Sequence, residues 1–320
     1  MTGRLFTRWL RSGARSWLLR GVLAVMLLGI ANFWGISSPN AFPKCSSIVE
    51  VDALPAIALA LAPVDRSLDV RRLLARIPYE RSLATPSSWI IHPDRRVEFV
   101  LETGGGDCAT KSRALARILQ ASDIPYSLVF VMDADEAETG AGHTVVECPV
   151  DMDGVRGIGV VDMLNASVVT VDGRLMTVDD MLPHAPLDAE FLRANENCRI
   201  DARYYGEFMA NTVVGVSRGE ELNRYFDFIA QTHVAMGSEG LEKVVFIAGA
   251  LVLGVYPAVY MTSEDIARLD GWLQFEVVLA HAVIWAVRAL GVLAVIDILA
   301  QLAQWREKRA RPAMAAGRAS

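Results

Sequence analysis

A cysteine, a histidine and an aspartate occur in this chain in an order that suits nucleophilic catalysis. Cys108 follows Gly104-Gly105-Gly106-Asp107 and opens a stretch with helical apolar spacing through Leu119, so we expect it in the first turn of a helix. There the positive end of the helix dipole and the free backbone N–H groups favour the thiolate over the thiol. The same N–H groups can bind an oxyanion, and the glycines let the backbone approach a substrate closely. Cys108 is therefore the candidate nucleophile.

His143 and Asp162 are the candidate partners of this nucleophile. His143 begins an expected strand 35 residues after Cys108 and can serve as a base, while Asp162 lies near the end of the next expected strand and can orient the imidazole. Adjacent antiparallel strands bring such positions side by side. A lone cysteine on a helix is usually a small core residue. The order of the three residues, each at the end of an element, indicates the catalytic triad.

The elements that must position these residues can be read from the middle of the chain. Helical spacing predicts helices over 64–77, 95–102 and 108–121, and β-forming residues predict strands over 126–132, 143–150, 157–163 and 167–171. From 178 to 240 we expect mainly helix. Helices followed by a run of strands predict an α+β domain.

Residues from about 93 to 166 resemble the transglutaminase-like superfamily of cysteine enzymes, whose fold is related to that of papain. The resemblance rests on Gly106-Asp107-Cys108, the apolar helix through Leu119, Ile124-Pro125, Gly142-His143 and Val161-Asp162. It implies that Cys108 is the nucleophile, that His143 is the general base and acid, and that Asp162 orients the imidazole, with no metal or organic cofactor.

The chain departs from this family beside two of the three residues. Ala109-Thr110-Lys111 stand where acidic and aromatic residues are common, and Thr144-Val145-Val146 follow the histidine where an aromatic residue is frequent. The segment 105–108 is also similar to that of arylamine N-acetyltransferases, which use the same triad. The apolar ends of the chain argue against that soluble, coenzyme-A-dependent class.

Two other side chains near the triad have alternative readings. Lys111 lies one helical turn after Cys108 and either supports the thiolate or is a solvated helix charge, of which the second is the commoner. Asn165 either assists Asp162 or is a turn residue. The acidic run 133–138 lacks the ligand order of a calcium loop, and the histidines lack metal-binding spacing, so no metal site is predicted.

The two ends of the chain have the composition of membrane segments. Five arginines precede the uncharged stretch 21–36, which is flanked by tryptophans and indicates a signal peptide or, as we prefer, an uncleaved signal anchor. The runs 244–261 and 277–296 are each about long enough to span a bilayer. We therefore divide the chain into a cytoplasmic flank and anchor (1–44), the transglutaminase-like domain (45–240), C-terminal membrane helices (241–305) and a basic tail (306–320).

This organisation predicts a protein of the cell membrane whose catalytic domain lies on the extracytoplasmic side. Both ends of the chain are basic and look cytoplasmic, whereas three full spans would place them on opposite sides, so the number of spans stays open. The four cysteines form no CxxC pair. One disulfide among Cys45, Cys148 and Cys198 would suit an exported domain, and the spacing does not choose the pair.

Composition and motifs together define the expected function. The net charge of -6 excludes the basic footprint of a nucleic-acid-binding protein. The partners expected are a protein or peptide substrate, the lipid bilayer and other membrane proteins. The expected activity is that of a membrane-anchored cysteine hydrolase or acyl-transferase that acts on an amide or peptide bond. The alternative is a non-catalytic binding or assembly module that keeps the same fold.

Overall fold

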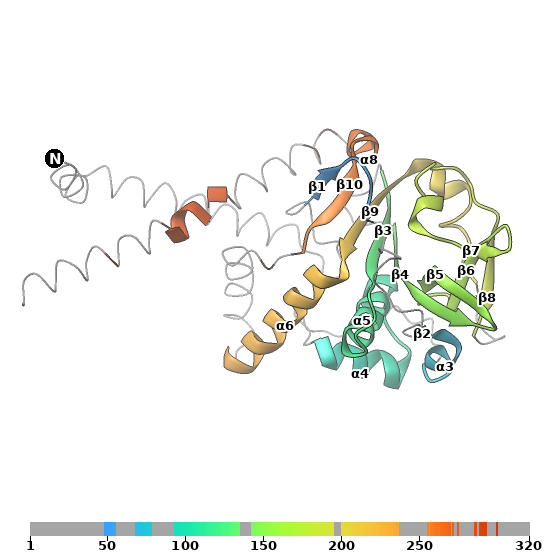
Figure 1. Ribbon diagram of the computed structural model, residues 1–320, viewed down its shortest axis with the longest axis horizontal. Helices are drawn as coiled ribbons and strands as arrows, with labels where there is room; N and C mark the ends of the chain where they lie inside the picture. The colour runs from blue at the N-terminus through green and yellow to red at the C-terminus, as the bar shows by residue number, and fades with distance from the viewer. Residues whose placement is uncertain are drawn as a thin grey trace, which may run out of the picture.

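A computed structural model describes residues 48–55, 68–78, 93–134, 142–194, 200–236 and 257–269, with single residues and short runs between 255 and 299. Within these residues a mixed sheet has the strand order β1-β10-β9-β3-β4-β5-β6-β7, with β2 on β4 and β8 on β6 (Figure 1). The strands are β1 (Ile48–Val51), β2 (Leu68–Asp69), β3 (Ser127–Asp133), β4 (Gly142–Met152), β5 (Val155–Asp162), β6 (Ser167–Val171), β7 (Arg174–Leu175), β8 (Ala189–Arg193), β9 (Thr212–Arg218) and β10 (Val259–Thr262). The helices are α3 (Val70–Leu74), α4 (Pro93–Thr103), α5 (Cys108–Ala121), α6 (Gly219–Met236) and α8 (Ser263–Arg268), with short 3-10 turns η2 (Val178–Asp180) and η3 (Glu207–Asn211).

The centre of the sheet is buried on both faces because its side chains alternate between two cores. On one face Leu128 and Phe130 of β3 pack with Leu115 and Leu119 of α5. On the other face Val129 of β3 packs in a second cluster, which includes residues of the segment 176–209. Helices α4, α5 and α6 lie together beside the central strands in Figure 1. The sheet is therefore enclosed between these helices and the segment 176–209.

The antiparallel register of β3, β4 and β5 brings one end of each strand to the same place. The start of β4 pairs with the end of β3 through Val131↔His143, and β4 pairs with β5 from Val146↔Val161 to Met152↔Val155. Residues 142–145 therefore extend beyond the ladder with β5. His143 at the start of β4 and Asp162 at the end of β5 consequently lie at the same end of the sheet.

The membrane-helix part of the predicted fold class is corrected by the structure. Among the helices of the described ranges, none combines the length and the apolar character needed to cross a bilayer. The segment 21–36 lies outside the described residues, as do most of 244–261 and much of 277–296. The described end of 244–261 forms β10, because Val259–Thr262 pairs with β1 and β9 within the sheet. The described protein is thus a mixed α/β sheet domain rather than an α+β domain flanked by membrane helices.

Two other expectations for the elements need correction. The expected helix over 64–77 is described only from residue 68, where β2 precedes the short helix α3. The region 178–240, expected to be mainly helical, contains β8 and β9 before α6 begins. Strand β9 lies between β10 and β3 near the middle of the sheet, so this region contributes to the core.

Candidate active site

The loop before α5 is built to place Cys108 in the first helical turn. Asp107 is the N-cap, since its Oδ1 accepts a hydrogen bond from the Thr110 N–H at 2.7 Å. Gly106 has a φ of 104°, and a Cβ there would meet Thr110 Cγ2 at 2.8 Å. Only glycine fits this backbone and this close approach. Cys108 itself is partly exposed.

His143 and Asp162 form a buried pair. The distance between His143 Nε2 and Asp162 Oδ2 is 2.8 Å, and both side chains are inaccessible to solvent. Gly142 immediately precedes the histidine, and a Cβ at this position would lie 2.4 Å from the Val131 carbonyl oxygen. A side chain at position 142 would therefore push β4 away from β3 and displace the imidazole.

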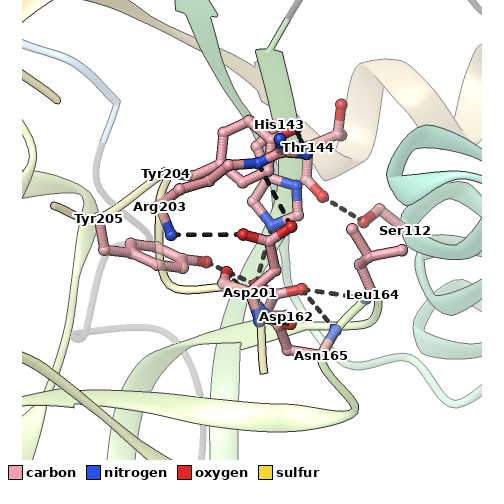
Figure 2. A network of polar contacts seen from close by, with 10 residues as sticks. All are labelled: Ser112, His143, Thr144, Asp162, Leu164, Asn165, Asp201, Arg203, Tyr204 and Tyr205. Carbon is pink, nitrogen blue, oxygen red and sulfur yellow. Dashed lines mark hydrogen bonds and ion pairs between the residues drawn. The ribbon is translucent and has the colours of Figure 1, made fainter. Parts of the chain in front are cut away.

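Asp162 is held by five donors, which fix the direction of its carboxylate (Figure 2). Oδ1 accepts from the backbone N–H groups of Leu164 and Asn165 at 3.0 and 3.1 Å. Oδ2 accepts from Asn165 Nδ2 at 2.7 Å and from the Tyr205 hydroxyl at 2.9 Å, in addition to His143. Hydrogen bonds of this number favour the ionised carboxylate.

Two adjacent tyrosines enclose the imidazole. The Tyr204 ring stacks on His143 with centroids 4.5 Å apart and planes inclined by 10°, and Tyr205 meets the imidazole edge-on at 6.0 Å. The Arg203 guanidinium lies 4.8 Å from the centroid of the Tyr204 ring. The segment that carries these residues is tied to Asn165, whose Oδ1 accepts from the Asp201 N–H at 2.8 Å. The tyrosines therefore keep water away from the pair formed by His143 and Asp162.

The surroundings of the pair favour its charged state. Burial alone would lower the pKa of His143, but the charge and hydrogen bond of Asp162, together with the hydrogen bond and charge of Cys108, raise that pKa to about 10. Burial would raise the pKa of Asp162, but the charge and hydrogen bond of His143 outweigh it and lower that pKa. Burial and the neighbouring Asp162 carboxylate raise the pKa of Tyr205, which therefore keeps its proton and donates it. At neutral pH the imidazole is thus protonated beside an ionised carboxylate.

The second ring nitrogen of His143 is available to the cysteine. Nδ1 is buried and has no hydrogen-bond partner within the described part of the chain. Cys108 is the second side chain, after Asp162, that raises the pKa of the imidazole. A protonated ring with Nε2 on Asp162 carries an unused Nδ1–H, which is the kind of donor that stabilises a nearby thiolate.

The structure pairs His143 with Asp162 and places Cys108 at the start of α5, and it changes the interpretation of other residues. Lys111 is buried, so its interpretation as a solvated helix charge is wrong. Asn165 contacts Asp162 directly, since its Nδ2 donates to Asp162 Oδ2. Cys148 is a free, buried thiol whose pKa is raised by burial and by Glu147, while Cys45 and Cys198 lie outside the described residues. No cluster of metal-binding side chains occurs among the residues with a described position.

The contributions of Tyr204 and Tyr205 were missed by the sequence reasoning. They come some forty residues after Asp162, in an irregular segment without a motif. The only signal in the sequence is a pair of adjacent tyrosines within a polar stretch.

Comparisons with known protein families, with curated proteins and with solved structures find no match to this chain. The chemistry of the site therefore has to be inferred from its own geometry.

Proposed function

We propose that this protein is a transglutaminase-like cysteine hydrolase or acyl-transferase that acts on an amide or peptide bond. The observation that supports this proposal is the buried His143, whose Nε2 is 2.8 Å from Asp162 and whose other nitrogen is left for Cys108 at the start of α5. A nucleophile, a base and a group that orients the base are the three parts that covalent acyl chemistry requires.

The first half of the reaction forms a thioester. The Cys108 thiolate attacks the carbonyl carbon of the substrate, and the electron pair of the C=O bond moves to the oxygen. The backbone N–H of Cys108 donates to this oxyanion. When the tetrahedral intermediate collapses, the C–N bond breaks, and the protonated His143 donates its Nδ1 proton to the departing amine. The products are the free amine, the acyl-enzyme and a neutral imidazole.

The second half of the reaction returns the enzyme to its starting state. Water or an amine attacks the thioester carbonyl while His143 Nδ1 accepts its proton, and the C–S bond then breaks to release the Cys108 thiolate. Water yields a carboxylic acid and an amine yields a new amide. Asp162 supports both halves because it stabilises the imidazolium and holds the ring in one orientation.

Labelling of Cys108 with a thiol-reactive probe that mimics an amide tests this proposal. We expect rapid modification of Cys108, identified by mass spectrometry, and a rate about 100-fold lower in His143→Ala. His184→Ala is the matched control, since His184 is also a buried histidine and its Nε2 lies 3.3 Å from a buried carboxylate, that of Asp265. Slow and equal labelling in the wild type and in His143→Ala would refute the catalytic proposal and favour a binding module that keeps the fold.

A further inference from the structure

Ser112 makes a hydrogen bond between the helix that carries the nucleophile and the strand that carries the base. Its side chain is fully buried on α5, one turn after Cys108, and its Oγ donates to the Thr144 carbonyl oxygen at 2.8 Å. Thr144 is the residue that follows His143 on β4. Figure 2 shows this contact beside the histidine. The bond therefore joins α5 and β4 close to the proposed reacting pair, since Ser112 lies one turn after Cys108 and Thr144 follows His143.

The acceptor of the Ser112 hydroxyl differs from the usual acceptor of a serine or threonine hydroxyl inside a helix. Such a hydroxyl commonly donates to the carbonyl four residues earlier in its own helix. Thr103 and Thr232 do so here, with Oγ1 at 2.7 and 2.8 Å from the carbonyl oxygens of Phe99 and Phe228. The corresponding acceptor for Ser112 would be the carbonyl of Cys108. Ser112 reaches across to another element instead.

The hydrogen bond from Ser112 constrains the position of α5 relative to β4. The buried face of α5 is otherwise largely aliphatic, and apolar contacts are not directional, so they permit a helix to slide or rotate slightly. A hydrogen bond constrains both distance and angle. Residues 142–145 of β4 lie beyond the ladder with β5, whose register begins at Val146↔Val161. The start of β4 is thus paired with β3 on one side and receives this hydrogen bond from the Ser112 hydroxyl of α5.

We propose that Ser112 is a positioning residue that fixes α5 against β4 so that Cys108 meets His143 Nδ1. This role rests on the proposed function, because it concerns the contact between the same nucleophile and base. A displacement of about 1 Å between reacting groups can lower a rate by about 100-fold. Loss of the Ser112 hydroxyl leaves the apolar contacts in place, so we expect a smaller but clear loss of about tenfold in the reactivity of Cys108.

The test is the pH profile of Cys108 alkylation by a neutral haloacetamide, followed by mass spectrometry in the full-length protein. In Ser112→Ala we expect a rate about tenfold lower at neutral pH and a profile displaced toward that of His143→Ala. Ser217→Ala is the matched control: Ser217 is also fully buried, and its Oγ donates to a backbone carbonyl, that of Ala258, at 2.7 Å. Ser217 lies on β9, two strands away from β4 in the sheet, so its loss should lower stability without moving the profile.

The outcomes separate the role of Ser112 from the proposed function. If His143→Ala leaves the profile unchanged, the proposed function fails and the role of Ser112 fails with it. If His143→Ala changes the profile but Ser112→Ala overlays Ser217→Ala, only the role of Ser112 is refuted. Should Ser112→Ala not fold, Ser112→Thr decides, because it retains the hydroxyl. A folded Ser112→Thr protein should keep the wild-type profile, and a profile like that of His143→Ala would overturn the proposal.

Discussion

Replacement of Asp162 by asparagine should convert the protonated His143 imidazole into a neutral one, while the side chain at position 162 keeps its shape. The backbone N–H groups of Leu164 and Asn165 donate to Oδ1 of Asp162, and their orientation is fixed by the backbone. In the variant the amide oxygen must therefore occupy the place of Oδ1. The amide NH2 then faces Nε2 of His143, which has to act as an acceptor. The ring is neutral in this state, and its single proton lies on Nδ1, facing Cys108. Such a ring has lost the positive charge that stabilises the thiolate, and its Nδ1 cannot accept a proton from the thiol.

The size of the effect follows from the electrostatics of the site. The pKa of His143 is raised from 6.5 to about 10, which corresponds to about 5 kcal/mol in favour of the imidazolium. Burial has the largest effect on the pKa of His143 and lowers it. Among the side chains that raise this pKa, Asp162 has a larger effect than Cys108. If Asp162 supplies at least half of the net effect, about 3 kcal/mol, its loss should lower the reactivity of Cys108 at neutral pH by about 100-fold.

Two measurements check this prediction. An NMR titration of the His143 ring should show that the histidine is neutral at neutral pH in Asp162→Asn, and the alkylation rate of Cys108 should fall as calculated. The matched control is Asp265→Asn, which alters the carboxylate near His184 and should leave Cys108 unaffected. An alkylation rate within about threefold of the wild type, with an unchanged His143 titration, would show that the carboxylate does not sustain the imidazolium.

Three further predictions concern stability. Tyr205→Phe removes one donor to Asp162 without opening a cavity, so calorimetry should show a loss of about 2 kcal/mol and a Tm lower by about 4–8 °C; an unchanged Tm would contradict this. The pKa of His143 is raised, so the stabilisation by its pairing with Asp162 is complete below pH 6.5 and should be lost as the pH rises through about 10; urea unfolding over this range measures it, and a flat dependence would count against the pair. Burial lowers the pKa of His184, so below pH 6.5 the unfolded chain binds a proton at this residue more readily than the folded chain does. The free energy of unfolding should therefore fall as the pH drops below 6.5, and urea unfolding should show a smaller decline in His184→Asn.

The sequence predicted well those parts of the fold that local patterns encode. The helix beginning at Cys108 was predicted because the apolar residues through Leu119 recur with helical spacing, and α5 begins at that residue. The strand 167–171 matches β6, and the two strands that carry His143 and Asp162 were also found. Local patterns were therefore sufficient to predict the elements that carry Cys108, His143 and Asp162.

The parts that were missed depend on contacts between distant segments. Strand β9 contains the β-branched residues of a strand, but its place between β3 and β10 is set by pairing with residues far away in the chain. The end of the apolar run 244–261 was read as part of a membrane helix, whereas residues 259–261 belong to β10, because hydropathy does not distinguish such a helix from a strand buried in a sheet. Lys111 was read as solvated because its helix position gave no sign of what covers it. Long-range packing decided each of these cases.

The short, irregular segment that carries Tyr204 and Tyr205 has a consequence for how the site can be lost. Most of the sheet is held by strand pairing, whereas residues 200–206 reach the site through hydrogen bonds to Asn165 and Asp162 and through ring contacts with His143. Segments of this kind open at lower free energy than the core of a sheet. Local opening of these residues would let water reach the imidazolium and remove a donor from its carboxylate while the strands remain folded. Hydrogen exchange at 200–206 should therefore follow the loss of Cys108 reactivity more closely than global unfolding does.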